Sequence, residues 1–321
     1  MKKPPFLGFA SLALATLLAV VSAKAEDAAK SAYPVEPVPA SLRASEFYAK
    51  YCNASGYPIV ASVRVNDFAL REAAFLIDAM LAHRPDVRKA MIESGSRLCI
   101  IGYNEFTTDL PEFAKLGPVR GFESLNPKDF WDARARGTGG SQTDPYCSCG
   151  EENLLGYPGD PYETECILIH EFAHNMHLRG VVRVDPTFDD RLKATYDQAM
   201  KADLWKGKYA SVNHHEYFAE GVQSWFNNNR PPDHDHNHVD TREELLEYDP
   251  GLAAHCREVF GETKLKYTKP ATRLTGHLAG YDPSQAPQFV WPDRLKKAKQ
   301  EIRESALRRN KQAAQKSPAE K

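Results

Sequence analysis

The feature that most constrains this chain is a pair of histidines, His170 and His174, at the ends of the sequence His-Glu-Phe-Ala-His. Residues four apart lie one turn apart on the same face of an α-helix. Asp160 can cap such a helix and Pro161 suits its first position. The apolar residues around the motif also keep to one helical face. The sequence therefore predicts a half-buried helix over residues 161–179 that carries both imidazoles on one side.

Two imidazoles in this arrangement can bind one Zn²⁺ at roughly 2.0–2.1 Å each. On the helix, Glu171 is rotated by about 100° from His170. It cannot share the metal as an equal ligand, but it can reach a water molecule on the metal. We therefore predict one zinc ion per chain, with Glu171 as the general base. The alternative is a hydrogen-bonded surface helix without metal. A half-buried helix favours the metal, because a buried His-Glu-His set would be costly to leave unpaired.

A second window, residues 209–220, reads Tyr-Ala-Ser-Val-Asn-His-His-Glu-Tyr-Phe-Ala-Glu. With the first motif it resembles the anthrax lethal-factor type of zinc peptidase, a family that also includes secreted proline-proline endopeptidases. That family pairs a helical H-E-F-x-H with a downstream Y-A-S-x-N-x-x-E-[FY]-F-A-E stretch on a second helix. The resemblance is tight over residues 165–178 and 209–226, and it extends loosely over 95–265. It implies a zinc-peptidase catalytic domain.

The resemblance also implies roles for individual residues of the second window. Glu216 corresponds to the third zinc ligand, and Tyr209 corresponds to an assisting hydroxyl. Glu220, one turn after Glu216, would be an acid that orients a ligand histidine. The pair His214-His215 departs from the family pattern and adds rival ligands.

Other histidines also compete for the metal. His177 falls about one turn after His174 and could support the site or bind the ion. Three more, His234, His236 and His238, alternate with polar residues after two prolines. Such a tract can form a secondary metal site, although in a polar loop it is more often solvated or lines a cleft.

The remaining pattern predicts an α+β fold, with a small sheet before residue 160 and mostly helices after it. Strands are expected at 59–65 and 98–101, and helices at 67–83, 85–95, 185–203, 213–226, from 241 to before 250, and near 256–260. Residues 102–160 are rich in Gly, Pro, Asn and Asp, which predicts long loops. A strand near 97–103 is a candidate edge against which an extended peptide could lie.

The N-terminus has the pattern of a secretory signal peptide. Lys2 and Lys3 precede an apolar run, and Ala23-Lys24-Ala25 suits cleavage before Glu26. The prediction is a signal peptide over 1–25, with an uncleaved anchor as the alternative. The mature protein would then be secreted or periplasmic, with no further membrane span.

Charge and composition divide the rest of the chain. Residues 26–40 contain three prolines and are predicted to be a linker. Residues 41–293 are predicted to form the catalytic domain. Loss of residues 1–25 removes three lysines and changes the net charge from −2 to −5. Residues 294–321 hold ten Lys/Arg and three Asp/Glu, so this tail carries +7 and residues 26–293 carry −12. Such a tail is typically a solvated helix, although it could contact an anionic surface. Nothing else indicates nucleic-acid binding.

Six cysteines complete the inventory: Cys52, Cys99, Cys147, Cys149, Cys166 and Cys256. Export makes at least one disulfide bond an expectation, although six cysteines allow 15 full pairings. The spacing of Cys147 and Cys149 is too short for a C-x-x-C metal or redox motif.

Together these observations predict an exported zinc-dependent hydrolase that cleaves peptide or protein substrates. The alternative from another class is a non-catalytic envelope protein that binds a partner and keeps zinc for stability. The two differ in the fourth zinc position, which protein fills in a structural site and water occupies in a catalytic one. Glu171 favours catalysis, because a structural site has no use for a base there.

Overall fold

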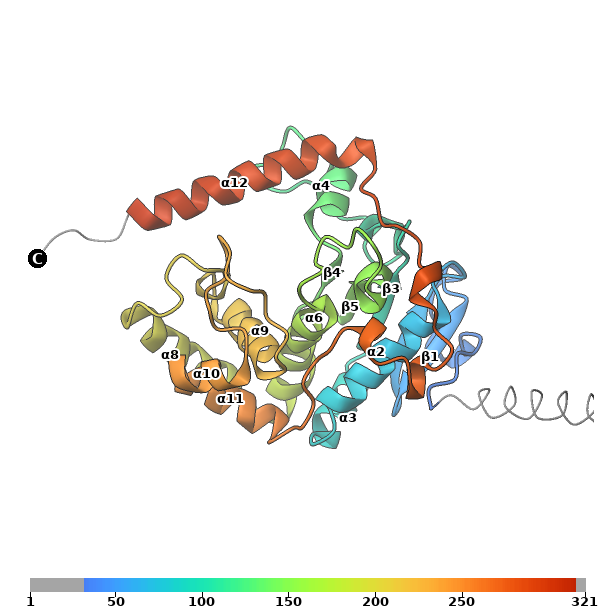
Figure 1. Cartoon of the computed structure of the whole chain (residues 1–321), viewed down its shortest axis with the longest axis horizontal. Helices are drawn as coiled ribbons and strands as arrows, with labels where there is room; N and C mark the ends of the chain where they lie inside the picture. Colours follow the sequence, from blue (N-terminus) through green and yellow to red (C-terminus); the bar gives the residue numbers. More distant parts are fainter. Residues whose placement is uncertain (1–31, 316–321) are drawn as a thin grey trace, which may run out of the picture.

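A computed structural model describes residues 32–315, which form a small sheet and a larger set of helices (Figure 1). The strands are β1 (Lys50–Ala54), β2 (Tyr57–Ala61), β3 (Arg97–Ile101), β4 (Gly137–Thr138) and β5 (Tyr146–Gly150). The helices are α2 (Asp67–Met80), α3 (Pro85–Glu93), α4 (Pro127–Arg134), α5 (Glu151–Leu155), α6 (Ile167–Met176), α7 (Val182–Val184), α8 (Phe188–Lys201), α9 (His214–Trp225), α10 (Arg242–Tyr248), α11 (Pro250–Phe260) and α12 (Lys296–Gln315). The fold is α+β, as predicted.

The five strands form one sheet in the order β1-β2-β3-β5-β4. β3 runs parallel to both of its neighbours, whereas β1 and β4 pair antiparallel at the two ends of the sheet. In the middle, Ile100 pairs with Ala61 on one side and Cys149 on the other. The prediction that residues 97–103 form an edge is therefore wrong. An apolar run such as this one is typical of a central strand with both faces covered.

Helices cover one face of the sheet and loops cover the other. Ile59, Leu98 and Ile100 belong to the same buried cluster as the apolar residues of α2 and α6. Val60 and Cys99 point to the opposite face, where a separate cluster is completed by the loops at residues 42–48 and 110–116. Because side chains alternate along a strand, the two clusters bury both faces of the central strands.

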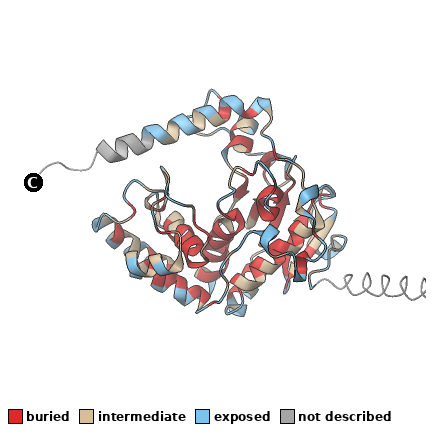
Figure 2. Ribbon diagram, viewed as in Figure 1, coloured by how far each residue is buried: buried red, intermediate tan, exposed pale blue. Residues whose placement is uncertain are grey.

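The main core continues from the sheet into the helical region. The ring of Phe172 on α6 packs edge-on against Tyr57 of β2, with centroids 5.3 Å apart. The same buried cluster includes Phe218 of α9 and Leu252 of α11. Figure 2 shows buried residues concentrated in the centre of the molecule, on the strands, α6 and α9. One continuous core thus holds α6 and α9 against each other.

Part of the predicted linker and most of the predicted basic tail lie in the described region. Glu36 forms a β-bridge with Tyr51, so this part of the linker contacts the domain. In the tail, Arg294 contacts Asp129 and Asp132 of α4. The long helix α12 then projects beyond these contacts (Figure 1).

Several predicted helix boundaries are confirmed by their caps. The side chain of Asn66 accepts a hydrogen bond from the Phe68 amide at the start of α2. Thr241 and Glu244 form a reciprocal capping box at α10. The start predicted at residue 161 is wrong, because α6 begins at Ile167. The loops predicted over 102–160 also contain β4, β5, α4 and α5.

All six cysteines are buried and have free thiols. The expected disulfide bond is therefore not present. Cys147 and Cys149 lie on one face of β5, and successive same-face side chains of a strand point in parallel rather than toward each other. Cys99, on the neighbouring strand, faces the opposite side of the sheet. The sheet thus separates Cys99 from Cys147 and Cys149.

Within residues 32–315 no helix combines the length and the apolar character needed to cross a membrane. The predicted signal peptide, residues 1–25, lies outside the described residues.

Candidate metal centre

The first histidine pair lies on α6, which is buried on nearly every side. His170 and His174 are only 8% and 9% exposed, and apolar residues such as Phe172 fix the other faces of the helix in the core. Because the two histidines are four positions apart on the helix, their imidazoles project from the same side. The core therefore dictates where both rings point.

The third predicted ligand comes from the start of α9. Asn213 caps this helix, and its side-chain oxygen accepts hydrogen bonds from the amides of His215 and Glu216 at 2.8 and 3.0 Å. Asn is among the preferred N-cap residues for this reason. The cap fixes the first turn of α9 and directs Glu216 toward the α6 histidines.

The three side chains meet in a nearly equilateral triangle. The distance from His170 Nε2 to His174 Nε2 is 3.1 Å, and Glu216 Oε2 lies 3.1 Å from each of these nitrogens. Neighbouring ligand atoms around a tetrahedral zinc at roughly 2.0–2.1 Å lie about 3.3 Å apart. The donor set thus fits a zinc ion.

A buried hydrogen-bond chain fixes the orientation of His170. Its Nδ1 lies 2.8 Å from Gln223 Oε1, and Gln223 Nε2 donates to Glu165 Oε2 at 2.7 Å. Because the side-chain nitrogen of Gln223 donates to Glu165, its side-chain oxygen faces His170 and accepts a hydrogen bond from Nδ1–H. This arrangement leaves the Nε2 lone pair free for a metal.

Glu220, the acid expected to orient a ligand histidine, lies slightly farther away. Its Oε1 is 3.5 Å from His170 Nδ1, so Gln223 makes the shorter contact. Sequence reasoning missed Gln223, although a signal existed: it follows Glu216 by seven residues, which is two helical turns. Glu216, Glu220 and Gln223 therefore share one face of α9.

Glu171 lies beside β4, where two glycines let the strand approach α6. A Cβ atom added to Gly137 would come within 2.9 Å of Glu171 Cγ, and one added to Gly139 would come within 2.4 Å of His174 Cβ. Side chains at these positions would push the strand away from the motif. The absence of side chains there brings the end of the sheet next to the predicted base.

Tyr209 begins the 3₁₀ turn η4 (Tyr209–Ser211), just before α9. Its ring centroid lies 6.1 Å from that of His170, and its amide donates to Asp235 O at 2.8 Å. Burial, together with the negative charge of Glu216, raises the pKa of the Tyr209 hydroxyl well above its usual value. The structure thus brings a protonated phenol next to the three candidate ligands.

The charges of the cluster favour a cation. Burial opposes ionisation of Glu216, but hydrogen bonds from His170 and His174 outweigh it and hold the pKa of Glu216 well below its usual range. Burial also lowers the pKa of His170, yet Glu216 reverses this effect and raises the pKa to about 10. Burial raises the pKa of Glu171. Carboxylates thus converge on two imidazoles in a place shielded from water, and a divalent ion would neutralise them.

The rival histidines lie apart from this triangle. His177, His214 and His215 converge on a different carboxylate, that of Asp189.

The members of the histidine tract diverge from one another. His236 is buried between Glu220 and Asp233, His234 contacts Asp235, and the His238 ring packs on Tyr248. Across residues 32–315, neither group of side chains that could hold a metal includes a member of the tract.

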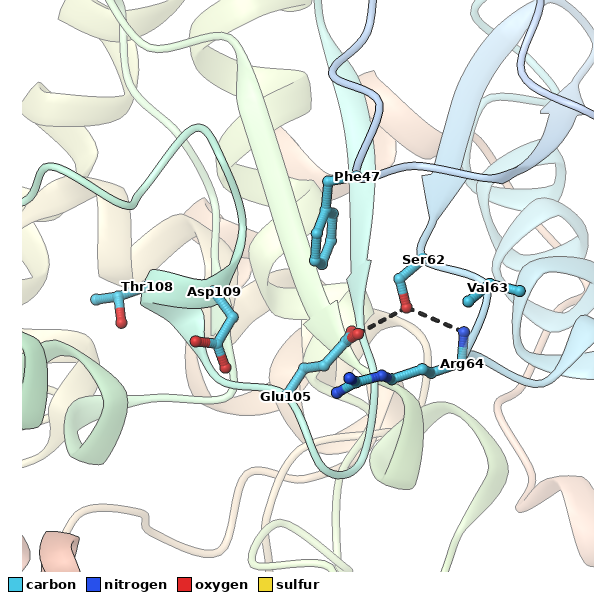
Figure 3. A pocket seen from close by; sticks show the side chains of 7 residues that line it. All are labelled: Phe47, Ser62, Val63, Arg64, Glu105, Thr108 and Asp109. Atoms are coloured by element: carbon cyan, nitrogen blue, oxygen red, sulfur yellow. Dashed lines mark hydrogen bonds between the residues drawn. The ribbon is translucent and has the colours of Figure 1, made fainter.

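A separate open pocket of about 600 Å³ lies beyond the ends of β2 and β3. Figure 3 shows its lining: Phe47, Ser62, Val63, Arg64, Glu105, Thr108 and Asp109. Ser62 Oγ donates to Glu105 Oε1 at 2.7 Å, and the Arg64 amide donates to Ser62 Oγ at 3.1 Å. These polar groups satisfy one another, and none of the candidate metal ligands lines this pocket.

No protein-family model matches the sequence, and no curated protein matches it. Among solved structures, the chain is similar to the Pro-Pro endopeptidase of Paenibacillus alvei, with 18% sequence identity and a TM-score of 0.43. The similarity covers 63% of this chain and 97% of that chain. The case for a function therefore rests on the geometry of the site.

Proposed function

We propose that this protein is a zinc-dependent peptidase whose active site lies between α6, α9 and β4. The observation that carries the proposal is the 3.1 Å triangle of His170, His174 and Glu216, with Glu171 on the adjoining face of the same helix. Three protein ligands beside a carboxylate base are the composition of a catalytic zinc site.

His170, His174 and Glu216 would hold the ion, which when bound polarises the scissile carbonyl and acidifies water. The hydrogen bond from His170 Nδ1 to Gln223 keeps that ring in the tautomer that presents Nε2.

Glu171 would act on the proton of the attacking water. Its carboxylate accepts this proton and then delivers it to the nitrogen of the leaving amine. Its position one residue after His170 keeps it beside the ligands without joining them. Burial raises its pKa, which makes it a stronger base than an exposed glutamate.

Tyr209 would donate a hydrogen bond from its hydroxyl to the carbonyl oxygen as negative charge develops there. The raised pKa keeps this hydroxyl protonated at neutral pH, and its turn lies directly before the helix that supplies Glu216.

A peptide is the substrate that suits the surroundings best. β4 is the last strand in the sheet order, and its one partner among the described strands is β5. Its other edge can therefore pair with an extended peptide backbone. Gly137 and Gly139 allow this end of the sheet to lie close to α6, which would place a bound peptide next to Glu171. We also propose that the protein is exported, on the basis of the pattern at residues 1–25.

The alternative is a structural zinc in a binding protein. Structural zinc sites almost always have four protein ligands. In the described part of the chain, the group formed by His170, His174 and Glu216 contains three. This count favours catalysis.

The test is a cleavage profile on a proteome-derived peptide library, comparing the wild-type chain with Glu171→Gln. The variant should retain zinc and its melting temperature but lose hydrolysis by roughly 10²–10⁴-fold. Glu163→Gln, an exposed change before the same helix, serves as the control and should cleave normally. Wild-type turnover by Glu171→Gln would refute the mechanism. A zinc-loaded wild-type chain that cleaves nothing would favour the structural role.

A further inference from the structure

A second group of potential metal ligands lies beyond the first. His177, Asp189 and His215 each offer a ligand atom, and these atoms all lie within 4.8 Å of one another. Each comes from a different element: the π-helical turn η3 (His177–Val181), the first turn of α8, and the first turn of α9. Figure 1 shows α8 and α9 in the helical region, and η3 directly follows α6 in the chain.

His177 is the member that demands an explanation. It is fully buried, and its ring packs against those of Phe188 and Phe218, with centroids 5.3 and 5.4 Å away. Within residues 32–315, neither of its ring nitrogens makes a well-aligned hydrogen bond, and its Nε2 lies beside the carboxylate of Asp189. A buried polar group without a well-aligned partner costs about 1–3 kcal/mol, and an ion bound at Nε2 would remove that cost for this nitrogen.

The geometry around Asp189 indicates the nature of that partner. His177 Nε2 lies 3.0 Å from Asp189 Oδ1, yet the two atoms are not aligned for a hydrogen bond. His215 Nε2 lies 3.5 Å from the same oxygen. Distances near 3.3 Å without hydrogen-bond alignment are expected when lone pairs point at a common ion rather than at each other.

A fourth side chain supports the carboxylate. His214 Nε2 lies 3.1 Å from Asp189 Oδ1 with hydrogen-bond geometry. Three imidazoles around one carboxylate oxygen exceed what that oxygen can accept, because it has two lone pairs. An imidazole that does not donate to this oxygen can take the other tautomer, in which Nε2 presents a lone pair that a metal ion could accept.

We propose that His177, Asp189 and His215 form a second divalent-cation site, for zinc or a similar transition metal, next to the proposed active site. Imidazole and carboxylate are the ligands that such ions prefer. A bound ion would tie η3, α8 and α9 together and would fix the first turn of α9, where His215 directly precedes Glu216. This raises the expected content from one zinc ion to two per chain.

The site can be tested by zinc stoichiometry, without any measurement of hydrolysis. The full chain is loaded with Zn²⁺, desalted, and analysed for metal and protein. We expect two zinc ions per wild-type chain, one in Asp189→Ala, one in His174→Ala, and none in the double variant. Asp189 is partly exposed, so its replacement spares the core. His83→Asn removes an exposed histidine elsewhere and should leave two.

A thermal readout separates the two sites. In the His174→Ala background, added Zn²⁺ should raise the melting temperature, because the ion binds the folded chain. The additional change Asp189→Ala should abolish this shift. One zinc in the wild type with none in His174→Ala would overturn the second site while leaving the first intact. Two zinc ions retained in Asp189→Ala would also overturn it.

Discussion

Gln223 provides the sharpest test of how the proposed zinc site is built. It accepts a hydrogen bond from His170 Nδ1 at 2.8 Å and donates one to Glu165 at 2.7 Å. Gln223→Leu keeps a side chain of similar size but removes both polar groups. His170 would then be free to rotate or to adopt the other tautomer, and both changes weaken its Nε2 as a ligand.

The expected effect follows from this lost support. Removing a partner that orients a ligand histidine typically lowers metal affinity by about 10–100-fold, which corresponds to roughly 1.4–2.7 kcal/mol. The buried groups left without a partner also cost about 1–3 kcal/mol each in folding stability. Glu165 keeps a second contact, with Arg230 at 3.6 Å, so most of the loss should come from His170.

The assay is competition for Zn²⁺ with a coloured chelator. It is best performed in the Asp189→Ala background, so that one site is titrated. Ser224→Ala is the matched control, because Ser224 is the next residue of α9 and its hydroxyl donates to Val239 O at 2.9 Å, away from the metal ligands. It should lose about 1 kcal/mol of stability with unchanged zinc affinity. An unchanged dissociation constant in Gln223→Leu, or equal losses in both variants, would refute the reasoning.

Three further predictions concern other parts of the molecule. Tyr209→Phe should lower turnover by roughly 10²–10³-fold with unchanged zinc content, and equal turnover in a peptide assay would leave the tyrosine a packing role. Gly221→Ala should lower the free energy of unfolding by about 1–3 kcal/mol in denaturant, because the new Cβ would lie 2.6 Å from a leucine of α11. Gly117→Ala, with no atom within 4 Å of the added carbon, should have little effect. Burial lowers the pKa of His236, but the carboxylates of Glu220 and Asp233 outweigh this effect and raise the pKa above its usual value of 6.5. The stability that His236 contributes is thus complete below pH 6.5 and is lost as the pH rises through the folded-state pKa. His236→Gln should flatten the pH dependence of the melting temperature above pH 6.5, and an unaltered profile would contradict this.

The features that could be predicted from the sequence are those set by short-range interactions. A cap joins residues no more than three or four apart, and the side chains of Asn66, Asn213 and Thr241 cap the helices that were expected to begin near 67, 213 and 241. The spacing of His170 and His174 is likewise a property of one helix. These local signals were sufficient to outline most of α2, α9 and α10.

The errors came where a distant residue competes with a local signal. Asp160 does accept a hydrogen bond from the Tyr162 amide, as a cap would. The side chain of Asn153 then intervenes: it donates to Asp160 and to the carbonyls of Tyr162 and Glu165, and its oxygen accepts from the Ile167 amide. These contacts hold residues 161–166 in a turn, so that the helix begins only at Ile167. The residues next to a helix start cannot reveal a hydrogen-bond partner, such as Asn153, that comes from another segment of the chain.

The short strand β5 was missed for the same reason. Its sequence, Tyr-Cys-Ser-Cys-Gly, is a weak strand signal by itself, and it lies in a segment rich in turn-forming residues. It becomes a strand by pairing in parallel with β3, more than 40 residues earlier in the chain. The helix α4, by contrast, carried readable signals, since Asn126 caps it and Pro127 begins it.

The first turn of α9 links the two proposed metal sites. One side-chain oxygen, that of Asn213, accepts the amides of both His215 and Glu216. These consecutive residues differ by about 100° in direction on the helix, so they face the Asp189 group and the α6 histidines respectively. Any shift of this turn would move a ligand of each site at once. An ion bound by His215 would therefore restrain Glu216 through the shared cap, without contacting it and without taking part in the chemistry.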